Sequence, residues 1–100
     1  MGSRTLRSWP RLRACAPRSA AVEHLRRVAR VEWQAGTLFD LMAAEVSDPR
    51  TAGMLRGRAE QARRRAAQAA ADAGRLARRI AQLAAQASRS RERRRPRRLA

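Results

Sequence analysis

The chain has 100 residues and a mass of 11.2 kDa, which leaves room for one small domain at most. Alanine supplies 23 of its apolar residues, so few large side chains are available to fill a core. All 24 basic residues are arginine and only eight residues are acidic, giving a formal net charge of +16. This composition disfavours a large enzyme with a deep active-site cleft, and we expect a protein without catalytic activity.

The sequence lacks the motifs of several further classes of protein. No apolar run approaches the ~18–20 residues that a membrane-spanning helix needs. Cys15 is the only cysteine and His24 the only histidine, so neither an internal disulfide nor a zinc cluster is expected. The sequence also contains no glycine-rich phosphate loop and no nucleophile elbow.

The first 19 residues carry five arginines, no acid, and prolines at positions 10 and 17. We expect residues 1–19 to form a flexible basic leader. Such a composition is typical either of a disordered basic arm or of an organelle transit peptide. The expected location is therefore the cytoplasm, or an organelle if the leader is a transit peptide.

A first helix is predicted over about residues 20–46, with Ser19 as its N-cap. Apolar residues recur at steps of three and four along this segment, which places them on one helical face. They are Ala21, Leu25, Val28, Ala35, Phe39, Met42 and Val46, flanked by Val31, Leu38 and Leu41. A turn is predicted at residues 47–49, where Pro49 cannot continue the helix and Asp48 can cap the next one.

The second helix, predicted over about residues 49–88, has the clearest pattern in the chain. Ten consecutive apolar positions alternate in steps of four and three, as in a coiled coil. They are Leu55, Ala59, Ala62, Ala66, Ala69, Ala73, Leu76, Ile80, Leu83 and Ala87. Residues 89–100 then form an arginine-rich tail, which we expect to be disordered because its like charges repel.

The expected fold is therefore all-α, an antiparallel two-helix hairpin with disordered basic termini. A three-residue break between long amphipathic helices favours such a hairpin. Two alanine-rich helices leave one flank of each helix uncovered, and association into a four-helix bundle would cover it. We therefore expect a homodimer.

Glu32 lies at a position of the first helix where the apolar pattern expects a hydrophobic residue. Because an unpaired buried charge is costly, it needs a partner or access to water. A hairpin that turns near residue 48 places position 32 opposite residues 63–66, where three arginines are available. The interpretations are an ion pair with one of these arginines, a metal ligand, or a side chain tilted toward water.

The segments Glu32–Ala35, Leu38-Phe39 and 41–43, together with Asp48-Pro49, Leu55 and Ala59-Glu60, resemble ferritin-like proteins of the rubrerythrin type. The resemblance implies a helical oxidoreductase whose di-iron centre uses Glu32 and Glu60 as ligands. The histidine of the family's Glu-x-x-His motif is replaced by arginine, at Arg63 or Arg65, and a guanidinium cannot bind a metal. The resemblance therefore implies either a lost metal site or an iron site assembled between subunits.

The arginine clusters point to binding of nucleic acid or another polyanion, without sequence specificity and without chemistry. Arginine pairs with phosphates in a bidentate manner, which suits nucleic-acid backbones. The candidate contact residues are Arg63, Arg64, Arg65, Arg78, Arg79, Arg89, Arg91, Arg93, Arg94, Arg95, Arg97 and Arg98. A third possibility is a coiled-coil scaffold that binds a partner protein and uses the tail only for localisation.

Overall fold

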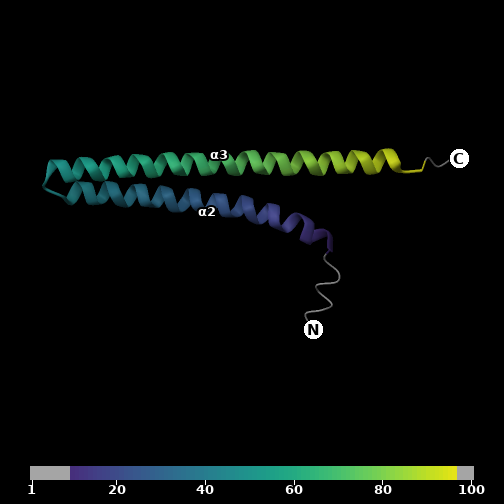
Figure 1. Cartoon of the computed structure of the whole chain (residues 1–100), viewed down its shortest axis with the longest axis horizontal. Coiled ribbons are helices and arrows are strands. Elements are labelled where there is room, and N and C mark those ends of the chain that lie inside the picture. Colours follow the sequence, from purple (N-terminus) through teal and green to yellow (C-terminus); the bar gives the residue numbers. More distant parts are fainter. Residues whose placement is uncertain (1–9, 97–100) are drawn as a thin grey trace, which may run out of the picture.

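The computed structural model describes the backbone of residues 10–96 and the side chains of residues 18–96. This part of the chain forms two antiparallel helices, α2 (Pro10–Glu45) and α3 (Pro49–Arg94), which lie side by side (Figure 1). The all-α hairpin predicted from the sequence is confirmed.

The connection between the helices is short because Asp48 and Pro49 together begin α3. The Asp48 carboxylate accepts a hydrogen bond from the Thr51 backbone N–H at 3.1 Å, and Pro49 occupies the first turn. The Thr51 hydroxyl also donates to this carboxylate, and these hydrogen bonds lower the pKa of Asp48. Asp48 is the N-cap of α3, as predicted, and the non-helical residues are 46–48, one residue earlier than the predicted turn at 47–49.

The α3 side of the interface follows the predicted pattern through its first half. Its buried residues are Ala52, Leu55, Ala59, Ala62, Ala66, Ala69 and Ala73. Beyond them Leu76, Ile80 and Leu83 are only half-buried, and Ala87 is exposed. The interface therefore weakens toward the C-terminal end of α3, where α2 curves away from it (Figure 1).

The α2 side of the interface differs from the prediction by one residue at alternate positions. Val22, Gly36 and Ala43 are buried, whereas Ala21 and Met42 are exposed and Ala35 is half-buried. A Cβ atom on Gly36 would lie 3.1 Å from the Ala59 carbonyl oxygen, so the two backbones approach closely here. The alanine surface of α3 allows this approach, and Gly36 and Ala43 are smaller than their neighbours Ala35 and Met42. Nearer the N-terminal end of α2, where the helices separate, Val22 is buried instead of Ala21.

Both helices extend into the predicted flexible ends, so the expected boundaries at residues 19–20 and 88–89 are wrong. α2 begins at Pro10, which suits a first helical turn, rather than after Ser19. Pro17 lies inside α2, and the N-terminal part of this helix is curved (Figure 1). Residues 1–9 and 97–100 of the predicted leader and tail lie outside the described residues.

α3 continues to Arg94 because arginine is a good helix former and favours the negative end of the helix dipole. Charge repulsion is thus outweighed over residues 89–94. The helix ends where Pro96 restricts its neighbour, and Arg95 is accordingly extended, with φ −66° and ψ 127°.

Candidate polyanion-binding surface

The C-terminal part of α3 extends beyond the N-terminal end of α2 and is a single projecting helix (Figure 1). Seven of the predicted contact residues in this half of α3 and its cap are exposed and form no ion pair within the described part of the chain. They are Arg78, Arg79, Arg89, Arg91, Arg93, Arg94 and Arg95. Arg97 and Arg98 lie outside the described residues.

Five carboxylates are engaged in ion pairs, which lie along the hairpin before the projecting end. The pairs are Arg26–Glu23, Arg63–Asp40, Arg64–Glu60, Arg65–Glu32 and Arg75–Asp72. Arg63 also lies over the Trp33 ring, 5.9 Å from its centroid. The predicted cluster of residues 63–65 therefore has intramolecular partners for each of its three guanidinium groups.

The Glu32 carboxylate lies 3.0 Å from Arg65 Nε, across the hairpin interface. The prediction of an ion pair between Glu32 and the arginine cluster is confirmed. Glu60 instead points outward and pairs with Arg64 on its own helix, at 3.0 Å. No three His, Cys, Asp or Glu side chains among the described residues gather as a metal site would require. The ferritin-like resemblance and an inter-subunit iron site stay predictions.

The exposed face of α3 carries a second regular pattern, which consists of polar residues and does not appear in the apolar spacing. Polar residues recur at steps of four and three along its exposed face, at the same spacing as the buried positions. We call these residues the arginine–glutamine stripe: Arg75, Arg79, Gln82, Gln86, Arg89 and Arg93. Guanidinium and amide groups on one face both donate hydrogen bonds to phosphate oxygens. The spacing of three and four residues that predicts the buried positions also identifies this polar face from the sequence.

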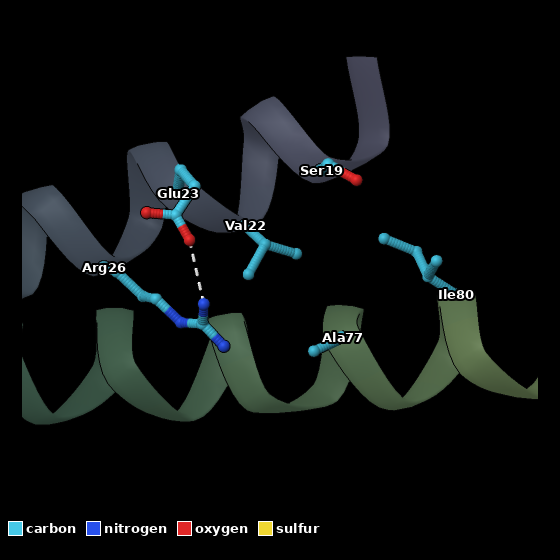
Figure 2. Close-up of a pocket in the computed structure, with 6 residues that line it drawn as sticks. All are labelled: Ser19, Val22, Glu23, Arg26, Ala77 and Ile80. Carbon is cyan, nitrogen blue, oxygen red and sulfur yellow. Dashed lines mark hydrogen bonds and ion pairs between the residues drawn. The ribbon is translucent and has the colours of Figure 1, made fainter. Parts of the chain in front are cut away.

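A shallow open hollow of about 280 Å³ lies where α2 begins to leave α3 (Figure 2). Val22, Ala77 and Ile80 provide its apolar walls, and Ser19 lies at one end. Arg26 donates a hydrogen bond to the Glu23 carboxylate at 2.8 Å beside it. The two charged groups at this rim neutralise each other, so the hollow adds no free charge to the basic surface.

Neither helix of the described part contains a stretch long and apolar enough to cross a bilayer. Comparison with models of protein families, with curated proteins and with solved structures gives no match to this chain.

Proposed function

We propose that the chain binds nucleic acid or a similar polyanion, without sequence specificity, through the projecting end of α3. One observation carries the proposal: the arginines at 78–79 and 89–95 are exposed and unpaired in the described structure, on the half of α3 that leads past the N-terminal end of α2 (Figure 1). Between residues 75 and 95 there are eight arginines and one acid, Glu92.

The geometry of the C-terminal half of α3 suits a polymer more than a small anion. Residues 75–94 form 20 helical residues, which extend over about 30 Å. A phosphate backbone carries charges every few ångströms along such a length, so several guanidinium groups can engage one strand simultaneously. The arginines lie all around the helix end rather than in one pocket, which favours backbone contact over the reading of base edges.

The salt dependence of binding tests this proposal. Contacts from the seven unpaired arginines to duplex DNA predict a slope of log K against log[salt] near −6. Between 50 and 200 mM salt, the affinity for a labelled 20-base-pair duplex should then fall on the order of 10³-fold. Fluorescence anisotropy with duplex DNA, single-stranded RNA and heparin measures it. An affinity that does not change with salt contradicts the proposal.

A charge-matched pair of variants tests the location of the surface. The tip variant replaces Arg89, Arg91, Arg93 and Arg94 with glutamine. The control variant makes the same change at four exposed arginines elsewhere, Arg27, Arg30, Arg50 and Arg56.

Both variants lose four positive charges, so a response to net charge alone weakens binding equally. We expect the tip variant to lose most of the affinity and to have a salt slope smaller by about 3 to 4. The control should retain most of the affinity and its slope. Equal losses would show that no localised surface exists.

A further inference from the structure

The outward face of α2 carries a second apolar row, separate from the one that packs on α3. It follows the same spacing of three and four residues, and we call it the α2 stripe: Val28, Val31, Ala35, Leu38 and Met42. The side chains that project furthest are 57% exposed at Val31, 61% at Leu38 and 49% at Met42. A continuous heptad row of this kind is typical of a helix with a second helical neighbour.

The exposure of this row follows from how the hairpin packs. Because glycine and alanine bring the two backbones close together, the buried side chains of the described residues are small, apart from Val22 and Leu55. The one-residue shift of the interface leaves Met42 outside it, on the same side of α2 as Val31 and Leu38. Trp33 and Leu41, on other parts of α2, are also more than half exposed. The hairpin alone thus leaves six large apolar side chains of the described residues exposed to water, five of them on α2.

We propose that a second copy of this chain covers the α2 stripe, with the two α2 helices packed antiparallel about a two-fold axis near Ala35. The row is close to symmetric about that residue: Val28 and Met42 each lie seven residues from it, and Val31 and Leu38 lie four and three residues from it. Val28 then lies opposite Met42 of the second copy, and Val31 lies opposite Leu38 of the second copy. An isologous contact of this kind requires such self-complementarity, and it produces a four-helix bundle with both α3 helices outside.

The distribution of charge on α2 favours this occupant and this direction. Residues 20–34 carry three arginines and two acids, whereas residues 35–48 carry three acids and no arginine. Antiparallel packing places the weakly basic half of each α2 against the acidic half of the other, and parallel packing places acid against acid. Residues 20–50 have a net charge of −1 in a chain of +16, so α2 is the part through which two copies can approach.

The mass in solution tests the association, in the absence of any polyanion. At about 50 µM, sedimentation equilibrium should give twice the chain mass of 11.2 kDa for the unaltered chain. Leu38→Glu places a charge in the contact and should give the mass of one chain. Ala44→Glu makes the same kind of change at an exposed position of α2 outside the stripe, and should leave the doubled mass.

Circular dichroism of both variants shows whether the helices remain. A single-chain mass for the unaltered protein, or equal effects of the two substitutions while both stay helical, would overturn the proposal.

Cysteine cross-linking tests the direction independently, after Cys15→Ser removes the native thiol. Ala35→Cys should form a disulfide-linked dimer under mild oxidation, since the two Ala35 positions meet at the axis. Val28→Cys should not, because the two copies of residue 28 lie about 21 Å apart in the antiparallel arrangement. Cross-linking at residue 28 but not at residue 35 would indicate parallel packing and would overturn the assignment.

Discussion

Replacing Gly57 with alanine should stabilise the hairpin, whereas the same substitution at Gly36 should not. Both glycines lie inside helices, so the intrinsic gain in helix propensity is about 1 kcal/mol at each position. A Cβ atom on Gly57 meets no atom within 4 Å. A Cβ atom on Gly36 lies 3.1 Å from the Ala59 carbonyl oxygen and 3.2 Å from Arg63 Cγ.

The contact at Ala59 decides the difference between the two substitutions. The Arg63 side chain can move, but a carbonyl oxygen inside α3 moves only if the helices separate. Overpacking of this kind costs about 1–3 kcal/mol, which offsets or exceeds the propensity gain. We therefore expect Gly57→Ala to raise Tm by roughly 4–8 °C. Gly36→Ala should leave Tm unchanged or lower it.

Thermal unfolding followed by circular dichroism at 222 nm measures both changes, at one fixed protein concentration and salt concentration. Urea titrations supply the free energies of unfolding for the same variants. If the two substitutions raise Tm equally, the close approach of α2 and α3 at Gly36 is refuted, and the buried alanines of α3 do not pack against α2 as described.

Further substitutions test the alanine side of the interface, the Asp48 cap and the ion pair across the interface. Ala62→Leu enlarges a fully buried side chain and should cost about 1–3 kcal/mol in urea unfolding, whereas Ala67→Leu on the exposed face should be nearly neutral. Asp48→Ala should lower Tm at neutral pH. Because the pKa of Asp48 is lowered in the folded chain, the stabilisation that its carboxylate provides is present above pH 3.8, the ordinary pKa of the group. This stabilisation is lost as the pH falls through the lower pKa of the folded chain. Asp48→Asn should therefore weaken the dependence of Tm on acid pH. Glu32→Gln should cost less than about 1 kcal/mol at low salt, since its partner Arg65 is 57% exposed.

The hairpin could be predicted because its signals are local. Asp48 and Pro49 combine a cap with a residue that cannot continue the preceding helix, so the turn position follows from two adjacent letters. Once the turn is placed, counting residues away from it sets the register. That count is why the Glu32 partner could be restricted to residues 63–65 before the contact with Arg65 was seen.

Features that depend on the opposite helix were harder to predict. The apolar spacing on α2 is compatible with two neighbouring rows of residues. The row that contains the small residues Gly36 and Ala43 packs against the alanines of α3. The same limitation applies to the basic surface. Composition identifies the arginines as candidates, but only the packing distinguishes Arg63, whose guanidinium meets Asp40, from Arg89, which has no such partner in the described chain.

Because α3 is longer than α2 and its last turns are rich in arginine, the two ends of the hairpin differ in charge. The turn end, residues 35–62, holds four acids and three arginines, a net charge of −1, while residues 75–95 at the opposite end of the hairpin hold a net seven positive charges (Figure 1). An extended negative field therefore exerts a torque as well as an attraction, turning the molecule lengthwise before contact. If the chain binds a polyanion as proposed, this orientation brings the C-terminal half of α3 into contact first and leaves the turn furthest from the charged polymer.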